Sequence, residues 1–337
     1  MNSRLARRGL LLLSAALMAG CNTVVMNPSG DIAAQQSKLI VISTVLMLLI
    51  IVPVILLTLL FAWRYRQSNT SAKYDPEWDH STKLELVIWG APLLIIIALG
   101  MVTWIYTHKL DPYRKLERLD ENRPLPASVK PLVVEVVAMD WKWLFIYPEQ
   151  GIATVNELAA PVDVPVQFKI TATHAMNSFF IPALAGQIYA MPGMQTQLHA
   201  VINKAGKYEG FSANYSGAGY SDMRFTFHGL STEEFAQWVQ KAKAGQGELN
   251  RANYLELEKP SIKDPVRQFA NVDKDLYHAI LNRCVRDGEV CLDKMMTVDA
   301  NVKNAMNGKL GNMLVQSPQG RRPEAEICTT PTTTTAK

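Results

Sequence analysis

Two long runs without a charged residue dominate the hydrophobic pattern of the first third of the chain. The first covers residues 39–63 and the second covers residues 86–107. At about 1.5 Å per helical residue, the first run reaches about 37 Å, which crosses a hydrocarbon core of about 30 Å with some tilt. Each run contains a proline, Pro53 or Pro92, which membrane helices tolerate because neighbouring groups satisfy the freed carbonyl. We expect two transmembrane helices joined by a cytoplasmic loop over residues 64–85; a helical hairpin buried in a soluble protein is the alternative.

A targeting signal precedes the first run. Residues 1–20 carry three arginines, then an apolar stretch, then small residues directly before Cys21, which is the order of a lipoprotein signal. We therefore expect cleavage before Cys21, lipidation of Cys21, and a periplasmic N-terminus over residues 21–38; an uncleaved signal anchor is the alternative. With the N-terminus outside, the second helix returns the chain to the periplasm. We expect a lipid-anchored, multi-pass protein of the bacterial inner membrane.

The pattern changes to β-strands after a proline-rich linker over residues 108–131. Between residues 132 and 230, apolar and polar residues alternate with the period of half-buried strands, most clearly at residues 164–170 and 223–228. Glycine and proline separate these segments as they do in a sandwich or barrel. The predicted fold class is a membrane helical hairpin with an all-β Greek-key sandwich or barrel.

A helical period follows the β domain. Ser231 and Glu234 have the spacing of a capping box, and the apolar residues after them share one helical face. We expect a helical C-terminal extension over residues 231–285. The remaining residues, 286–337, are expected to form a tail that is disordered from about residue 318, where the composition becomes low in complexity.

Charge excludes one class of partner. The formal net charge is +4, and removing the three arginines of the signal leaves 4 − 3 = +1. The basicity is therefore largely a targeting feature, and the charge implies no basic face for nucleic acid.

Copper is the obvious cofactor to consider for an exported β domain that contains methionine and histidine. The candidate ligands are His174, Met176, Met191, Met194, His199, Met223 and His228. Blue-copper centres require a cysteine thiolate, and no cysteine lies between residues 22 and 283. We therefore expect no metal in this domain. His199 and His228 are expected to be solvated, and Met191, Met194 and Met223 are expected to fill the core.

The remaining cysteines lie near the C-terminus. Cys284 and Cys291 flank an Asp287-Gly288 turn, and in an oxidising compartment such a pair forms a disulfide more often than a metal site. Cys328 in the tail has no evident partner, and no Cys-x-x-Cys-His motif for covalent haem occurs.

Three motifs of the β domain resemble subunit II of ubiquinol oxidases of the cytochrome bo type, in the haem-copper oxidase superfamily. They are Met139-Asp140-Trp141-Lys142-Trp143, Asn177-Ser178-Phe179-Phe180-Ile181-Pro182 and Gln187-Ile188-Tyr189-Ala190-Met191-Pro192-Gly193-Met194. The resemblance extends from Cys21 to about residue 285 and implies a cupredoxin-like fold for the β domain. The strand with Trp141, Trp143, Phe145 and Tyr147 is interpreted as a packing surface.

The resemblance also locates a lost copper site. In the related cytochrome c oxidases, the binuclear copper centre called CuA uses the motif Cys-x-x-x-Cys-x-x-x-His-x-x-Met and one upstream histidine. The corresponding positions in this chain are Asn177, Asn214, Ala218, Asp222 and Phe225. All five side-chain ligands are absent, in agreement with the cysteine count.

The resemblance implies that the chain is subunit II of an enzyme that oxidises ubiquinol, reduces oxygen to water and moves protons outward. It implies a structural role for this subunit, without a cofactor of its own. Haems and copper-B are expected in subunit I, which would be its main contact, with subunits III and IV and membrane lipid as further partners. Glu85, at the cytoplasmic mouth of the second helix, would lie near the entrance of a proton pathway in subunit I. An interface anchor near Lys83 explains Glu85 equally well.

Two alternative functions are open at this point. A cytochrome c oxidase subunit that carries CuA would keep the family, but the missing thiolates argue against it. A free-standing lipoprotein with a cupredoxin-like binding domain, acting as a sensor or copper chaperone, would not need two transmembrane helices, because a lipid anchor alone would tether it.

Overall fold

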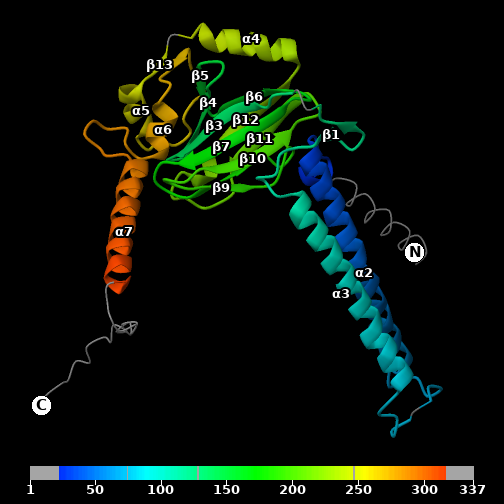
Figure 1. The fold of residues 1–337 in the computed structure, drawn as a ribbon. Helices are drawn as coiled ribbons and strands as arrows, with labels where there is room; N and C mark the ends of the chain where they lie inside the picture. The colour runs from blue at the N-terminus through cyan, green and yellow to red at the C-terminus, as the bar shows by residue number, and fades with distance from the viewer. Residues whose placement is uncertain (1–22, 74, 127–128, 246, 316–337) are drawn as a thin grey trace, which may run out of the picture.

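The computed structural model describes residues 23–315 apart from residues 74, 127–128 and 246. The expected signal peptide, Cys21, Cys328 and the tail from about residue 318 lie outside the described residues. Within them, a pair of long helices is joined to a β-sandwich, which is followed by a smaller, mainly helical part (Figure 1). The predicted fold class is confirmed.

The two long helices are α2(Asp31–Arg64) and α3(Thr82–Lys109), which lie side by side (Figure 1), and a single 3-10 turn, η1(Val24–Met26), precedes them. Both long helices are apolar and long enough to cross a membrane. α2 begins well before residue 39 because its first two turns pack on the sandwich, where Ala33 and Ser37 are buried. Hydropathy reports only the lipid-embedded part of a helix, so it does not predict these turns.

The sandwich consists of two mixed sheets, with strand orders β10-β7-β3-β4-β5-β14 and β6-β12-β11-β8-β9. The strands of the first sheet are β3(Leu132–Met139), β4(Lys142–Tyr147), β5(Ile152–Val155), β7(Pro165–Ala172), β10(Thr196–Val201) and β14(Arg267–Phe269). Those of the second are β6(Glu157–Pro161), β8(Asn177–Phe180), β9(Ile188–Ala190), β11(Gly206–Ser212) and β12(Arg224–Leu230). β3 pairs with β7 in parallel, as β6 does with β12, so the chain must cross over between these strands.

Alternating side chains build the core between the two sheets. Along β7, Val166, Phe168 and Ile170 are buried, whereas Gln167 and Lys169 are partly exposed. This is the period-two pattern that the sequence predicts for a strand with one covered face.

Strand β4 departs from that pattern because both of its faces are covered. Trp143, Phe145 and Tyr147 face the sandwich core, and Leu144 and Ile146 belong to a second apolar cluster beneath the C-terminal part. The predicted packing role is confirmed for these three aromatic side chains.

The C-terminal part begins with α4(Thr232–Lys243), which has the predicted capping box between Ser231 and Glu234. It continues with β13(Glu248–Leu249), α5(Arg251–Glu258), β14, β15(Asn271–Val272) and α6(Leu276–Leu281). A purely helical extension does not describe it, since β14 pairs with β5 at the edge of the six-stranded sheet. Strands of two or three residues are too short to produce a readable alternation.

Regular structure also occurs in the linker, in one loop and near the C-terminus. In the linker, β1(Arg118–Asp120) and β2(Arg123–Pro124) form a small hairpin. A 3-10 turn, η2(Tyr220–Asp222), lies between β11 and β12. Helix α7(Leu292–Val315) occupies residues that we assigned to the tail, and in Figure 1 it projects from the C-terminal part on the side away from α2 and α3.

Candidate functional site

The five positions that the resemblance assigns to lost CuA ligands lie around one loop, residues 213–223, which joins β11 to β12. Asn177 opens β8 beside this loop, and Phe225 lies in β12 directly after it. Among the residues that the structure describes, no group of three or more His, Cys, Asp or Glu side chains is placed to hold a metal ion.

Phe225, at the position that the resemblance assigns to the methionine ligand, is an aromatic core residue. Its ring stacks on Phe179 with 5.5 Å between centroids and 5° between planes, and lies 5.0 Å from the Phe145 ring and 5.7 Å from the Trp143 ring. Gly210 makes room for it, because a Cβ there would lie 2.1 Å from the ring. The position therefore stabilises the sandwich by burial and has no group that binds copper.

Asparagine amides close the same loop by hydrogen bonding. Asn177 is buried, and its Oδ1 accepts a hydrogen bond from the Ser212 hydroxyl at 3.1 Å while its Nδ2 donates to the Ala175 carbonyl. Asn214 Nδ2 donates to the Met176 carbonyl at 3.1 Å. The bonds of Asn177 satisfy a buried amide within the protein, and the set of side chains at the loop does not fit a copper centre.

Trp141 covers the other side of the loop. Its backbone is in the left-handed region, with φ +66°, and its indole N–H donates to the Ser216 carbonyl at 3.2 Å. The ring packs so closely on Gly219 that a Cβ there would lie 2.5 Å from it. Loop and aromatic motif are thus packed as one unit.

The histidines and methionines proposed as solvated or core residues divide differently in the structure. His199 is buried, with Nδ1 3.2 Å from the Pro112 carbonyl, and His228 is mostly buried, with Nε2 3.4 Å from Glu157. The prediction that both are solvated is wrong, because alternation identifies the outer face of a strand but not what covers it. Met223 fills the core as predicted, whereas Met194 is 56% exposed.

A buried ion pair that the sequence analysis missed joins the sandwich to the C-terminal part. Lys142 Nζ lies 3.4 Å from Asp264 Oδ2 and donates to the Lys259 carbonyl at 2.7 Å. Burial lowers the pKa of Lys142 despite the nearby carboxylate. Burial alone would raise the pKa of Asp264, but the Ser261 hydroxyl, Arg267 and Lys142 outweigh it, so the pKa of Asp264 lies below its usual value.

Glu85 lies in the first turn of α3, and its Oε1 is 2.8 Å from His80 Nδ1. Both side chains are exposed in the isolated chain. The carboxylate of Glu85 therefore contacts His80 in the preceding loop, and not Lys83, which the sequence suggested as its neighbour.

Cys284 and Cys291 form a disulfide. It connects the segment after α6 to the start of α7, and Cys284 is buried in the apolar cluster beneath the C-terminal part.

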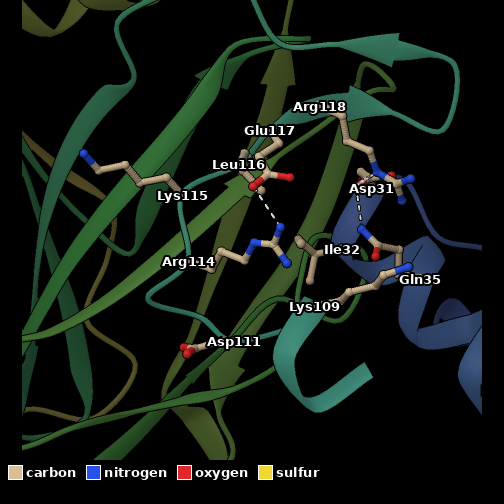
Figure 2. A pocket seen from close by; sticks show the side chains of 10 residues that line it. All are labelled: Asp31, Ile32, Gln35, Lys109, Asp111, Arg114, Lys115, Leu116, Glu117 and Arg118. Carbon is tan, nitrogen blue, oxygen red and sulfur yellow. Dashed lines mark hydrogen bonds and ion pairs between the residues drawn. The ribbon is translucent and has the colours of Figure 1, made fainter. Parts of the chain in front are cut away.

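The junction between the hairpin and the sandwich contains a network of polar contacts. Figure 2 shows Asp31, in the first turn of α2, facing Arg118 of the linker, with Asp31 Oδ2 3.0 Å from Arg118 Nε and 2.7 Å from Gln35 Nε2. Asp31 is almost fully buried, so the charge of this helix end is neutralised by its partner.

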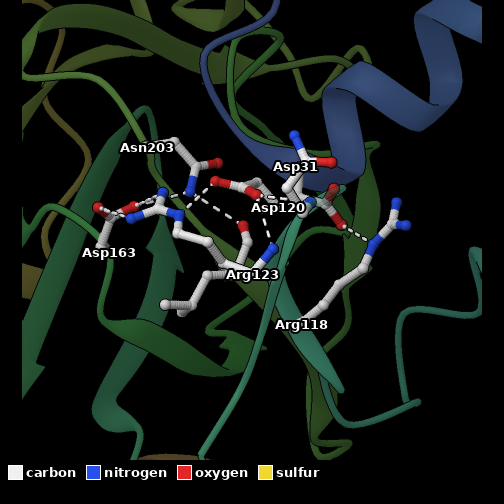
Figure 3. A network of polar contacts seen from close by, with 8 residues as sticks. Asp31, Arg118, Asp120, Arg123, Asp163 and Asn203 are labelled. Carbon is white, nitrogen blue, oxygen red and sulfur yellow. Dashed lines mark hydrogen bonds and ion pairs between the residues drawn. The ribbon is translucent and has the colours of Figure 1, made fainter.

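A second contact of the linker continues this network (Figure 3). The Arg123 guanidinium donates to both carboxylate oxygens of Asp163, at 2.7 and 2.8 Å, and also pairs with Asp120. Asn203 donates to Asp163 at 2.8 Å and to the Leu119 carbonyl at 2.9 Å. The linker hairpin is thereby fixed to the sandwich, and these paired charges lower the pKa of Asp163.

Main-chain contacts complete the junction. The N–H groups of Ser29 and Gly30 both lie 3.0 Å from the Ala183 carbonyl, to which they donate. Gly30 has no room for a side chain, since a Cβ would lie 2.6 Å from the Val201 carbonyl oxygen and 2.7 Å from the Leu184 carbonyl oxygen. The start of α2 is therefore held by backbone that cannot easily move aside.

Comparison with known proteins identifies close relatives. The family model "Cytochrome C oxidase subunit II, periplasmic domain" matches residues 149–229, and "COX Aromatic Rich Motif" matches residues 243–288. Ubiquinol oxidase subunit 2 of Acetobacter aceti is 50% identical over 311 residues, which cover 91% of this chain and 98% of the relative. Cytochrome bo(3) ubiquinol oxidase subunit 2 of Pseudomonas putida is 49% identical over 274 residues, covering 81% and 84%. The Pseudomonas aeruginosa protein of the same name is 45% identical over 284 residues, covering 84% and 83%.

Proposed function

This chain belongs to the family of ubiquinol oxidase subunit 2 and is part of an oxidoreductase complex, and we propose that it is the structural subunit of that complex, without a redox cofactor of its own. The substrate would be ubiquinol, because the relatives that are 45–50% identical are named ubiquinol oxidases. Oxygen would be reduced to water in a partner subunit that carries the haems and copper-B.

The observation that carries this proposal is the burial of Phe225 among Trp143, Phe145 and Phe179, at the position of a copper ligand. A redox metal needs donor atoms that converge on one point. Here one position is aromatic core and two others, Asn177 and Asn214, are engaged in hydrogen bonds to the protein. Electrons from a membrane-dissolved quinol would therefore reach the haems without passing through this chain.

The proposed role of each part follows from its place in the chain. The hairpin would bind subunit I within the inner membrane, and the sandwich would cover the periplasmic face of that subunit, with subunits III and IV as further neighbours. The Asp31–Arg118 ion pair and the close packing at Gly30 support this role, because they hold the hairpin against the sandwich. Lipidation of Cys21 would add a second membrane attachment.

Two functions are proposed for Glu85. Its position at the cytoplasmic mouth of α3, with an exposed carboxylate paired to His80, suits a group that collects protons for a pathway in subunit I. The same position suits an anchor at the membrane surface. His80→Asn, which removes the partner of Glu85 and keeps its carboxylate, separates the two roles.

The proposal is tested by purifying the full-length tagged chain from its own membranes in mild detergent. We expect haem-bearing subunits to copurify, together with quinol-dependent oxygen uptake, and copper no higher than the single copper-B ion requires. Recovery of the chain without a haem protein would overturn the structural role. Additional copper that stays with this chain after subunit I is dissociated would overturn the cofactor-free assignment.

A further inference from the structure

The short turn η1, before the first membrane helix, exposes three apolar side chains in succession. The exposed fractions of Val24, Val25 and Met26 are 53%, 38% and 49%. Within the part of the chain that the structure describes, these side chains are therefore left open to their surroundings. Contiguous apolar surface of this kind marks a site of contact with a protein or a membrane.

Contacts with α2 place the turn at the level where this helix enters the membrane. The Ser37 hydroxyl lies 3.9 Å from Met26 Sδ, so η1 lies beside the second turn of α2. The uncharged run, residues 39–63, begins two residues after Ser37. Lys38, between them, still lies among polar groups, because its ammonium pairs with Glu121. Since the uncharged run spans the hydrocarbon core, η1 lies at the edge of that core.

The apolar surface of the turn continues along α2. Val41 and Val45 lie four and eight residues after Ser37, which places them on the same face of the helix. Both side chains are exposed. In Figure 1 the first turns of α2 adjoin the sandwich and the rest of the helix extends away from it. The turn thus prolongs an apolar face of α2 towards the sandwich.

The chemistry of the turn suits lipid better than a protein partner. No charged residue lies between Arg8 and Asp31, so nothing in this segment opposes contact with acyl chains. Asp31 itself is buried beside Arg118. A protein interface also uses hydrogen bonds, about one per 100–200 Å², whereas acyl chains are fluid and require only apolar side chains.

We propose that η1 inserts Val24, Val25 and Met26 into the membrane leaflet on the sandwich side, as a short interfacial anchor beside α2. Apolar side chains at the edge of the hydrocarbon core are removed from water, which is favourable in the same way as burial in a protein. The anchor fixes the depth at which α2 leaves the membrane. This inference depends on the transmembrane helices and not on the proposed role in the oxidase.

The test measures the surroundings of single positions in the full-length chain, purified with the subunits that accompany it and reconstituted into phosphatidylcholine vesicles. A keto amino acid that carries a nitroxide replaces Val25, Asn27 or Glu233 in turn. Asn27 is the exposed polar residue directly after the turn. Glu233 is exposed on α4, which in Figure 1 lies on the side of the sandwich opposite to the hairpin. Oxygen concentrates in hydrocarbon and a nickel chelate stays in water, so the ratio of their collision rates with the nitroxide reports its depth.

We expect the ratio of oxygen to nickel collisions at Val25 to exceed the ratio at Glu233 several-fold, with a smaller excess at Asn27. Equal ratios at Val25 and Glu233 would show that the turn lies in water. Low collision rates with both reagents at Val25 would show that a protein partner covers it. Either of these results would overturn the proposal.

Variants separate the turn from the lipid that is expected on Cys21. With the nitroxide at Met26, the double variant Val24→Asn with Val25→Asn should lower the collision ratio towards that of a position in water. Thr23→Asn, the matched control at the exposed polar residue before the turn, should leave the ratio unchanged. If the double variant also leaves it unchanged, the depth is set by the lipid or by α2, and the side chains of η1 are not the anchor.

Discussion

The ammonium of Lys142 lies 3.4 Å from the carboxylate of Asp264, in a place where both side chains are at most 3% exposed. Lys142 belongs to β4 and Asp264 to the segment before β14, so the pair joins the sandwich to the C-terminal part. Asn156 strengthens the same contact, since its Nδ2 donates to the Asp264 carbonyl and its Oδ1 accepts from the Trp143 backbone N–H.

Removing one partner of this pair should destabilise the protein strongly. Asp264→Asn leaves the Lys142 ammonium buried without its counter-charge, which costs about 3–5 kcal/mol in typical proteins. The double variant Lys142→Met with Asp264→Asn should recover much of that loss, because an apolar side chain needs no partner. Urea unfolding, monitored by tryptophan fluorescence, measures the free energy of unfolding of the single and the double variant. Asp299→Asn, an exposed carboxylate of α7, is the control, and an equal effect of Asp264→Asn and Asp299→Asn would contradict the prediction.

The same carboxylate should make stability depend on acid pH. The pKa of Asp264 in the folded protein is lower than the ordinary pKa of an aspartate, because Ser261, Arg267 and Lys142 together outweigh burial. Its contribution is therefore complete above the unfolded pKa and is lost as the pH falls through the folded pKa. Between pH 5 and about pH 2 the free energy of unfolding should decrease more steeply for the natural protein than for Asp264→Asn. Parallel curves for the two proteins would show that Asp264 is not responsible.

Phe225 should contribute to stability and not to metal binding. Phe225→Ala opens a cavity between Phe145 and Phe179 and should cost about 3–5 kcal/mol, whereas Tyr215→Ala, at a ring that is 75% exposed, should change stability by no more than about 0.5 kcal/mol. Phe225→Met, which introduces the methionine that the resemblance expects at a CuA site, should bind no copper because the thiolates are still missing. Metal analysis after incubation with copper checks this, and stoichiometric retention would overturn our assignment of the loop.

Sequence reasoning located the hairpin and the main strands because their signals are local. The alternation of Val166, Phe168 and Ile170 depends only on which face of the strand is turned to the core. The uncharged runs depend only on the surrounding lipid. The absence of a thiolate also required no structure. The sequence did not predict contacts between distant segments, such as Lys142 with Asp264 or His199 with Pro112 of the linker. In each case the partner lies far away in the sequence, so no local pattern contains it.

The ends of elements were missed for a related reason. The first turns of α2 carry Asp31 and Gln35, and polar residues at that place indicate a chain outside the membrane rather than a helix packed on a sandwich. Helix α7 carries asparagine, aspartate, lysine and glycine among its apolar residues, so its composition resembles that of a loop. The first turns of α2 depend on tertiary contacts with the sandwich that outweigh local preference, whereas α7 is exposed over residues 293–303.

The disulfide between Cys284 and Cys291 should stabilise the C-terminal part. Closing a loop with a sequence separation of 7 is worth about 2–3 kcal/mol in the chain-entropy model. Cys284→Ser with Cys291→Ser should therefore lower the urea midpoint and allow proteases to cleave near residues 284–292 before they cleave the sandwich. Cys328→Ser is the control and should leave both measurements unchanged. If the double variant unfolds and is digested like the natural chain, the disulfide has no stabilising role.

Glu85→Ala should slow quinol-dependent oxygen uptake several-fold while the haem content of the purified complex stays the same, because the lost carboxylate would collect protons rather than hold the subunits together. His80→Asn removes the 2.8 Å partner of Glu85 but leaves the carboxylate in place, so it separates the two roles. A proton-collecting Glu85 predicts that His80→Asn retains most of the turnover. An anchor formed by the pair predicts that both variants lose haem-bearing partners to a similar extent on purification. Glu85→Asp provides a further control, because its side chain is shorter but still ionises. If Glu85 collects protons, this variant should restore turnover. The dependence of its rate on buffer pH should then match that of the natural enzyme and not that of Glu85→Ala.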